Sequence, residues 1–227
     1  MKFQLLTLFP EMFPGPVGHS VTGRAHAKNV WSFTATNIRD FATDKHKTVD
    51  DVPFGGGAGM VMKPDVVEAA LLSLPTQGRK IYMSPRGKVL TQSLVQELSS
   101  EPTLTILCGR YEGVDQRVLD AHDFEEISIG DYVLTGGELA AYIVMDAVIR
   151  LLPDGVGNPA TPEEESFSDG LLEYPHYTRP AQWTDAKGAT HPVPDILTSG
   201  HHGNVAKWRQ EQSLALTRTR RPDLLKK

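Results

Sequence analysis

Two glycine-rich segments that lie close together in the sequence carry charged side chains suited to a ligand site. Residues 109–113 enclose Arg110 and Glu112, and residues 130–137 enclose Asp131. Glycine lets the backbone approach a ligand closely, and charged side chains between glycines can then contact its polar groups. A single glycine loop commonly marks a turn and nothing more. Because both segments combine glycine with charge, the sequence favours a binding site.

The elements expected around these segments place them at one edge of a sheet. Each segment follows an apolar run typical of a strand and precedes a helical pattern. Two such units predict neighbouring parallel strands, and open α/β sheets bind ligands at the carboxyl ends of their strands. Strands are expected at residues 2–8, 31–37, 80–83, 104–108 and 126–129, and helices at 17–27, 64–74, 91–99, 138–152 and 204–218. The expected fold is α/β with a mostly parallel sheet.

A further glycine-rich stretch lies within residues 39–62, which show neither a helical nor a strand period. Residues 55–59 could hold a phosphate, but the Gly-Lys-Ser/Thr of a P-loop does not follow them. They also lack the spacing of a dinucleotide fingerprint. Long irregular segments in compact domains are usually functional or disordered. We expect a substrate loop here, with His46 and Asp50 among its polar side chains.

The helix expected at residues 138–152 is apolar nearly all round, so we expect it to be buried. Asp146 and Arg150 stand four residues apart on this helix. An intrahelical ion pair is one interpretation of that spacing. Arginine is rarely buried without a partner or a function, so a role in a site is the other.

Composition excludes several classes of protein. With 227 residues, 40% hydrophobic and 22% charged, the chain is typical of a globular protein. Cys108 is the only cysteine, so no internal disulfide is possible, and we expect a small buried side chain in a reduced, cytoplasmic protein. No apolar run approaches the ~18 residues of a membrane span, and the N-terminal apolar run is interrupted too early for a signal peptide. We expect no membrane partner.

Charge is distributed unevenly along the chain. The whole chain carries a net charge of -5, whereas residues 199–227 carry seven Lys and Arg against two acidic residues. A basic tail on an acidic body suits phosphate contact, although a solvated helical face is the plainer interpretation. A Pro-, Gly- and acid-rich stretch from residue 153 to 165 predicts a boundary. The expected organisation is an α/β domain over residues 1–153, a flexible linker over 154–169 and a small helical domain over 170–227.

Several longer motifs extend over nearly the whole chain. They are VTGRA (21–25), RDF (39–41), DKHKTVDDVPFGGGAGM (44–60), CGRYEGVDQRV (108–118), SIGDYVLTGGELA (128–140), SFSDGLLEYPHYTRP (166–180), LTSGHHGNVAKWR (197–209) and RRPDLL (220–225). In these motifs the chain resembles the bacterial tRNA (guanine-N1)-methyltransferases, which belong to the trefoil-knotted SPOUT class. The resemblance implies a deep knot in the first domain, S-adenosylmethionine as cofactor, and an obligate homodimer with its sites at the subunit interface. It also implies methylation of the guanosine just 3′ of the anticodon, position 37, in the anticodon stem-loop of tRNA.

Site residues follow from the resemblance by matching positions. Apart from the resemblance, substrate contacts are expected at His46 and Asp50 of the substrate loop and at Lys207 and Arg209 of the basic tail. Glu112 matches a carboxylate near a catalytic Mg2+. The implied cofactor contacts are Tyr82, Ser84, Pro85, Gly109, Arg110, Ile129, Gly130, Asp131, Tyr132, Val133, Leu134, Gly136 and Gly137.

The reaction itself requires a base and a cation. N1 of guanine carries a proton at neutral pH, so a base must remove it, and negative charge then develops on O6. Arg150 matches the family's catalytic arginine. Most members have Asp immediately before Ser-Phe as the base, whereas this chain has Glu165 there. Glu165 is our preferred base, with Asp169 as the alternative.

Two other classes of function fit parts of the sequence. A nicotinamide-dependent oxidoreductase would use glycine loops on parallel strands, but the dinucleotide fingerprint is missing. A non-catalytic RNA-binding protein could keep the same fold. The presence of Arg150, Glu112 and the cofactor loops argues against that alternative.

Overall fold

The computed structural model describes residues 1–155 and 165–225. The chain forms two compact units, Met1–Pro159 (unit 1) and Ala160–Lys227 (unit 2), and each is described by itself. Most of the linker expected at residues 154–169 lies outside the described residues.

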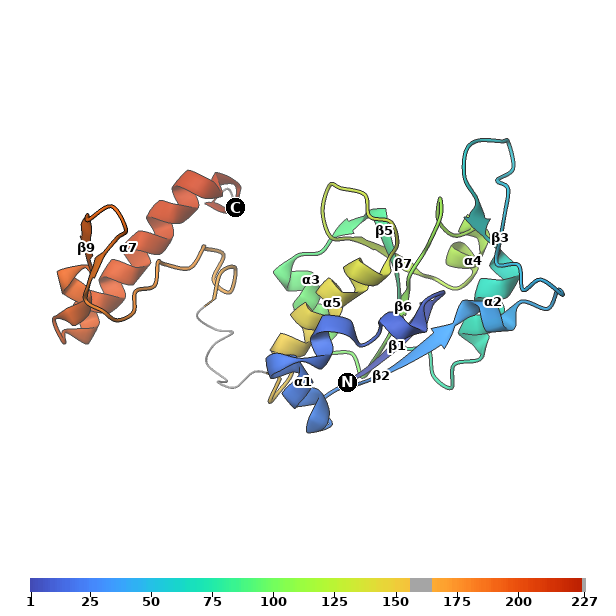
Figure 1. The fold of residues 1–227 in the computed structure, drawn as a ribbon, viewed down its shortest axis with the longest axis horizontal. Helices are drawn as coiled ribbons and strands as arrows, with labels where there is room; N and C mark the ends of the chain where they lie inside the picture. Colours follow the sequence, from blue (N-terminus) through green and yellow to red (C-terminus); the bar gives the residue numbers. More distant parts are fainter. Residues whose placement is uncertain (156–164, 226–227) are drawn as a thin grey trace. The chain divides into compact units, whose positions relative to one another are not determined.

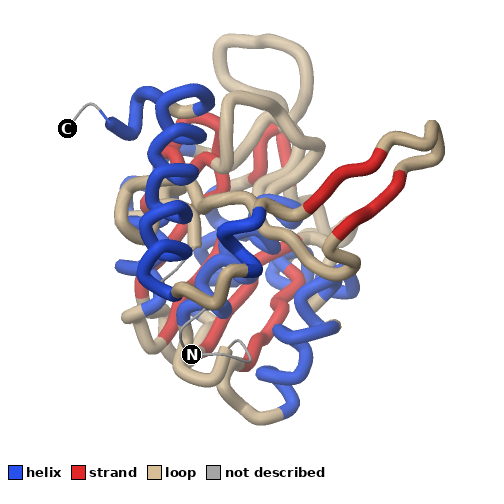
Figure 2. The backbone as a smooth tube through the Cα atoms, turned by 90° about the vertical axis from the view of Figure 1, so that its left-hand side faces the viewer, coloured by secondary structure: helices blue, strands red, loops and turns tan. Residues whose placement is uncertain are grey.

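Unit 1 is built on a five-stranded sheet in the order β2-β1-β6-β5-β7, with every neighbouring pair parallel. Figure 1 shows the strands side by side between two layers of helices, and Figure 2 shows the helices and strands of the chain from a second side. The α/β fold with a parallel sheet is confirmed. The strands are β1 (Lys2–Thr7), β2 (Ser32–Asn37), β5 (Arg79–Val89), β6 (Thr103–Leu107) and β7 (Glu125–Ser128).

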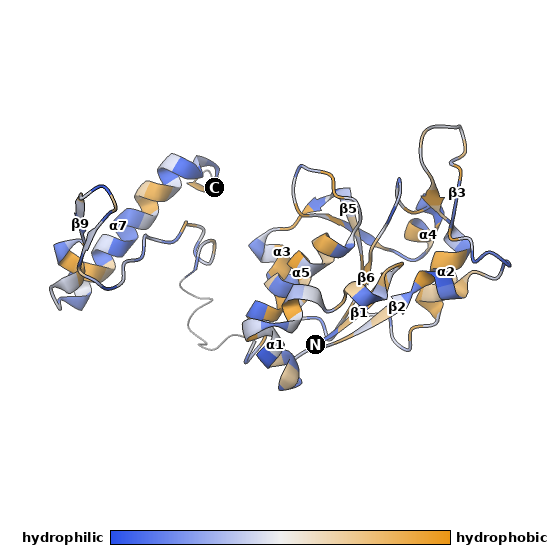
Figure 3. Ribbon diagram, in the orientation of Figure 1, coloured by the Kyte–Doolittle hydropathy of each residue, from blue (hydrophilic) through white to orange (hydrophobic). Residues whose placement is uncertain are grey.

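Helices cover both faces of the sheet because strands of a parallel sheet are apolar on both sides. Helices α1 (Ser20–Ala27), α3 (Gln92–Ser99) and α5 (Glu138–Leu151) lie on one face, and α2 (Pro64–Leu72) and α4 (Gln116–Ala121) lie on the other (Figure 1). Each layer has its own core cluster. Trp31 and Phe3 fill the first, and Leu71 and Met62 are fully buried in the second. Figure 3 shows hydrophobic residues concentrated on the strands and α5.

Strand β5 is longer than the sequence suggested. A strand is expected only at residues 80–83, but β5 begins at Arg79 and continues to Val89 after a bulge. Met83 and Lys88 both pair with Ile127, so the residues between them form the bulge. Gly87 packs there against the backbone of Glu126, where a Cβ atom would not fit. The bulge displaces Ser84 and Pro85 from the regular ladder at the carboxyl end of the sheet.

The expectation that β6 and β7 are neighbours is wrong, because β5 lies between them. Two strand–loop–helix units that follow each other in the sequence do not show whether an earlier strand of the chain lies between their strands in the sheet. The insertion brings a third loop, the β5 bulge, between the two glycine segments.

The irregular stretch before α2 contains short elements. A 3-10 turn covers Ile38–Phe41, and β3 (Asp50–Asp51) pairs with β4 (Val61–Met62) in an antiparallel ribbon. The segment between β3 and β4 projects from the body of unit 1 (Figure 1).

Unit 2 contains the long helix α7 (His202–Arg220) and a hairpin of β8 (Gln182–Thr184) and β9 (Thr190–Pro192). Short 3-10 turns cover Asp195–Thr198 and Pro222–Leu225. The amide of Leu172 donates to Thr217 Oγ1 at 2.9 Å, which fixes the preceding chain to α7. Among the helices of residues 1–155 and 165–225, none is both long enough and apolar enough to cross a membrane.

Candidate cofactor pocket and catalytic residues

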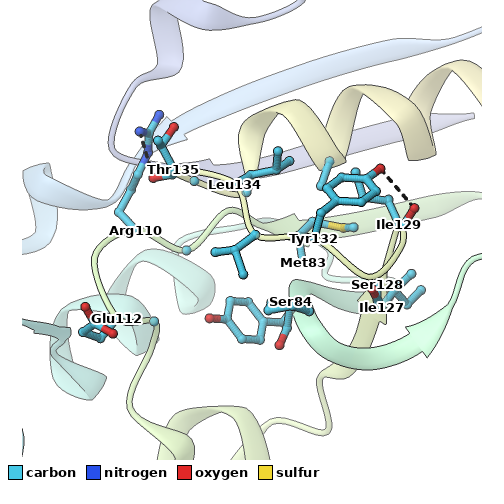
Figure 4. A pocket seen from close by; sticks show the side chains of 18 of the residues that line it. Met83, Ser84, Arg110, Glu112, Ile127, Ser128, Ile129, Tyr132, Leu134 and Thr135 are labelled. Atoms are coloured by element: carbon cyan, nitrogen blue, oxygen red, sulfur yellow. Dashed lines mark hydrogen bonds between the residues drawn. The ribbon is translucent and has the colours of Figure 1, made fainter.

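A pocket of about 260 Å³ lies at the carboxyl ends of β5, β6 and β7 (Figure 4). The β5 bulge, the 109–113 loop and the 129–137 loop form its walls. This volume is near the lower end of the range for small-molecule sites, roughly 300–1,000 Å³. The lining residues are Tyr82, Met83, Ser84, Pro85, residues 109–113, 127–130 and 132–137, and Ala140.

Every cofactor contact implied by the resemblance lines this pocket except Asp131. Asp131 is exposed on the loop between Gly130 and Tyr132, both of which do line the pocket. The sequence could not make this distinction, because the direction of one side chain in an irregular loop depends on the loop's backbone conformation.

The glycines of the two loops allow the loops to pack closely against neighbouring parts of the protein. A Cβ atom on Gly137 would lie 2.7 Å from the Cα of Cys108, and one on Gly109 would lie 2.8 Å from the ring of Tyr82. The amide of Gly137 also donates to the carbonyl of Gly109 at 2.9 Å. The glycines therefore let the two loops pack directly on each other and on β5, which fixes the shape of the pocket.

The side of the pocket formed by residues 129–134 is apolar. Tyr132 folds back over its own loop, and its hydroxyl donates to the carbonyl of Ile129 at 3.2 Å (Figure 4). Val133 is 83% exposed and Leu134 is 36% exposed. Such exposure is unfavourable unless something covers these side chains. A flat heteroaromatic ligand such as adenine would fit this wall. On the opposite side, burial raises the pKa of Tyr82, so its phenol stays neutral.

Arg110 lines the pocket, but its guanidinium is engaged within the protein. Its Nη2 lies 2.9 Å from Oε2 of Glu138, and its Nε donates to Oε1 at 3.2 Å. Glu138 is 1% exposed and also accepts a hydrogen bond of 2.7 Å from Thr7 Oγ1. Sequence reasoning missed both Glu138 and Thr7. The available signal was an acidic residue directly after Gly136-Gly137, in the first helical turn, where a carboxylate is favourable.

Glu112 lies on the pocket rim beside the end of the β3–β4 loop. Its amide donates to the carbonyl of Met60 at 2.9 Å, and its side chain occupies the space beside Gly59. Within the described residues, no group of three or more His, Cys, Asp or Glu side chains could hold a metal ion. Glu112 could supply one carboxylate oxygen to Mg2+, which usually keeps several water or substrate oxygens as its other ligands.

The candidate catalytic cation lies on α5, which is less buried than expected. Arg150 is half-buried in the last turn, and Asp146 is exposed. Leu139 and Ile143 are 50% and 45% exposed. One side of α5 thus packs against the sheet, and the opposite side of the helix carries an exposed apolar stripe that includes Leu139 and Ile143. A helix that is apolar all round can also bury its outer side against another chain.

Glu165 and Asp169 both belong to unit 2, where they line a second pocket of about 290 Å³ with Arg209. Asp169 Oδ1 accepts a hydrogen bond of 3.1 Å from the amide of Leu171. Arg209 stacks over the ring of Tyr174 with its guanidinium carbon 4.7 Å from the ring centroid. Both candidate bases therefore share one pocket of unit 2 with a candidate substrate contact.

The remaining substrate candidates are exposed or half-buried. Lys207 is exposed on α7, and its Nζ lies 4.0 Å from Glu211. His46 lies on a turn in which its amide donates to Asp44 at 2.9 Å, and Asp50 is half-buried in β3.

Comparison with known proteins assigns this arrangement to a family. The family model described as tRNA (Guanine-1)-methyltransferase TrmD matches residues 1–227. The chain belongs to this family. A tRNA (guanine-N(1)-)-methyltransferase of Rhodospirillum rubrum is 63% identical over 225 residues, covering 99% of this chain and 92% of the relative. The enzyme of the same name from Mesorhizobium japonicum is 56% identical, and the match covers 99% of this chain and 96% of that relative. The one from Bartonella henselae is 53% identical, and the match covers 99% of this chain and 95% of that relative. Membership of a methyltransferase family implies use of S-adenosylmethionine.

Proposed function

We propose that this protein transfers a methyl group from S-adenosylmethionine to N1 of guanosine 37 in tRNA. One observation carries the proposal: three loops from neighbouring strands form a pocket whose lining matches the family's cofactor contacts. We also propose a cytoplasmic location, because tRNA is modified there in bacteria.

The pocket residues fit the cofactor by their chemistry. Ile129, Val133 and Leu134 supply apolar contacts for an adenine ring, and the amides and carbonyls of the 109–113 and 129–137 loops supply polar contacts for its edge. When bound, S-adenosylmethionine supplies an electrophilic methyl group on its sulfonium. Arg110 supports the site indirectly, because its charge is paired with Glu138.

Catalysis in this proposal needs two groups of this chain. Glu165 removes the proton from N1 and so produces the nucleophile. Arg150 stabilises the negative charge that then develops on O6. Glu112 would contribute a carboxylate to Mg2+. Asp169 remains the alternative base.

The proposal includes a homodimer with the knot of the SPOUT class. The exposed apolar stripe of Leu139 and Ile143 on α5 supports a subunit interface. The direct packing of Gly137 on Cys108 supports the knot, since the 129–137 loop then passes against the end of β6.

The test is methyl transfer to unmodified tRNA transcripts. We expect labelled methyl groups from S-adenosylmethionine to appear in a transcript with G37, and 1-methylguanosine to be the only modified nucleoside. A matched transcript with A37 should remain unlabelled. Tight tRNA binding without any incorporation would instead identify a non-catalytic RNA-binding protein.

A further inference from the structure

The segment between β3 and β4 presents a nearly fully exposed aromatic ring. Phe54 is 98% exposed, and Val52 beside it is 70% exposed. An exposed phenylalanine of this kind contributes nothing to the core and leaves apolar surface in water. The position therefore needs an explanation outside the folding of unit 1.

The backbone holds Phe54 at the corner of a defined turn. The amide of Gly56 donates to the carbonyl of Pro53 at 3.2 Å, and Gly55 has φ +87. A positive φ at the third residue is characteristic of a type II turn, which strongly favours glycine there. Cβ atoms on Gly55 and Gly56 would meet nothing within 4 Å. These glycines thus serve backbone conformation, and the turn presents the ring to solvent.

The base of this loop is attached to the cofactor pocket. The amide of Met62 donates to the carbonyl of Gly113 at 2.9 Å, and the amide of Asp115 donates to Met62 at 3.1 Å. The backbone amide of Arg110 lies 3.3 Å from the sulfur of Met62. Together with the contact between Gly59 and Glu112, these bonds connect the loop to the 109–113 wall. Phe54 therefore stands on a loop that is continuous with the pocket rim.

The preceding turn adds a cation, Lys45, to the same segment. Asp44 accepts hydrogen bonds from the amides of His46 and Thr48, both at 2.9 Å, and so orders the turn. Lys45 and His46 are exposed on it. Exposed aromatic rings beside cations are the combination with which proteins bind unpaired nucleotides, by stacking and phosphate contact.

We propose that Phe54 stacks on an unpaired base of the tRNA anticodon loop and thereby positions the target guanosine over the cofactor pocket. This inference rests on the proposed function. The occupant is a nucleobase of the substrate, because the loop adjoins the pocket in which the substrate guanine must react. The expected contact also explains why the ring lies outside the core.

The test is a substitution series at Phe54 with tRNA and cofactor kinetics measured separately. Phe54→Ala should raise the KM and Kd for tRNA by roughly 5- to 150-fold, the usual value of one base–aromatic stack. The KM for S-adenosylmethionine should not change. Phe54→Trp should retain tRNA affinity, and Phe54→Leu should not, because stacking requires a π face. Leu72→Ala is the matched control, since Leu72 is an exposed apolar residue at the end of α2.

Three kinetic outcomes would overturn the inference while the wild-type protein still methylates tRNA. The first is an unchanged KM for tRNA in Phe54→Ala, and the second is a rise in the KM for S-adenosylmethionine alone in that variant. The third is a wild-type affinity for tRNA in Phe54→Leu. A change in the sedimentation of Phe54→Ala would point to a subunit contact and would also overturn it. If wild-type protein transfers no methyl group, the proposed function itself fails.

Discussion

Arg110, which is partly exposed, and buried Glu138 form an ion pair, with 2.9 Å between Nη2 and Oε2, that joins the two glycine loops of the cofactor pocket. Arg110 belongs to the loop after β6, and Glu138 begins α5 directly after the second loop. The guanidinium also lies 4.4 Å from the centroid of the Phe9 ring. The pair therefore connects both loops to the chain that follows β1.

Replacement of Glu138 should lower both the stability of the fold and the affinity of the pocket for S-adenosylmethionine. We expect Glu138→Ala to cost about 1–3 kcal/mol in the free energy of unfolding, because the partly exposed guanidinium of Arg110 and the buried hydroxyl of Thr7 both lose their acceptor. Affinity for S-adenosylmethionine should fall in the same variant. Thermal unfolding and calorimetric titration measure the two effects.

A double-mutant cycle provides the control for this pair. Arg110→Ala with Glu138→Ala should be less destabilised than the sum of the single variants, since neither charge is left alone. Strict additivity of the two losses would show that the charges do not depend on each other.

The ion pair also shows where sequence reasoning reached its limit. Apolar runs predicted four strands of the sheet, because burial on both faces leaves a strong signal in local composition. The edge strand β2 is less buried and was predicted from alternation and from its aromatic and β-branched residues. The partner of Arg110 could not be predicted, because residues 110 and 138 meet only through the arrangement of β6 and α5. The bulge after Met83 and the β8–β9 hairpin were missed for a similar reason, since both depend on pairing between segments. The resemblance identified the pocket lining but gave Asp131 the same status as its pocket-facing neighbours.

Acidification should remove the contribution of a second ion pair, between the first residues of β5 and β7. Arg79 Nε lies 2.7 Å from Glu125 Oε1, and the hydrogen bonds from Arg79 lower the pKa of Glu125 below its ordinary value of 4.5. A lowered carboxyl pKa stabilises the folded state above the unfolded pKa, and this stabilisation is lost as pH falls through the folded value. Glu125→Gln should therefore be less stable than wild type near neutral pH by about 0.5–1 kcal/mol, because the pair is partly exposed.

The difference between Glu125→Gln and wild type should shrink as pH falls below 4.5. Thermal unfolding from pH 7 downwards measures it. A difference that stays constant across this range would mean that the glutamine acts through packing and not through the lost charge.

The basic residues of α7 should contribute to tRNA affinity through phosphate contacts. Lys207→Ala and Arg209→Ala should each lower the slope of log Kd against log salt by about 1, because one fewer counterion is released. Glu211→Ala is the matched control, since Glu211 neighbours Lys207 on the same exposed helix face. Equal slopes for wild type and both cation variants would exclude these residues as phosphate contacts.

Arg150→Ala should abolish turnover and leave the Kd for S-adenosylmethionine nearly unchanged. A donor that stabilises a developing oxyanion is worth about 2.7–4 kcal/mol, or roughly 10²–10³-fold in kcat. Single-turnover methylation at saturating tRNA measures the chemical step. A loss below about tenfold would assign Arg150 to helix stability, with Asp146 four residues away as its natural partner.

The identity of the general base can be decided by two amide substitutions. Glu165→Gln should lower methylation by roughly 10²–10⁴-fold, the usual value of a positioned base. Activity of this variant should recover as pH rises, because more guanine is already deprotonated at N1. Glu165→Asp should remain active, since it restores the residue most common in the family. Asp169→Asn should cost little, because the amide oxygen can still accept the hydrogen bond that Asp169 receives from the amide of Leu171.

The alternative assignment gives the opposite pattern in the same two variants. If Asp169 is the base, Asp169→Asn loses activity and recovers at high pH, whereas Glu165→Gln stays near wild type. Binding of tRNA and S-adenosylmethionine is measured first in each variant, so that a loss of affinity is not read as a loss of chemistry. Full activity in both variants would exclude both carboxylates and leave water or another group to remove the proton.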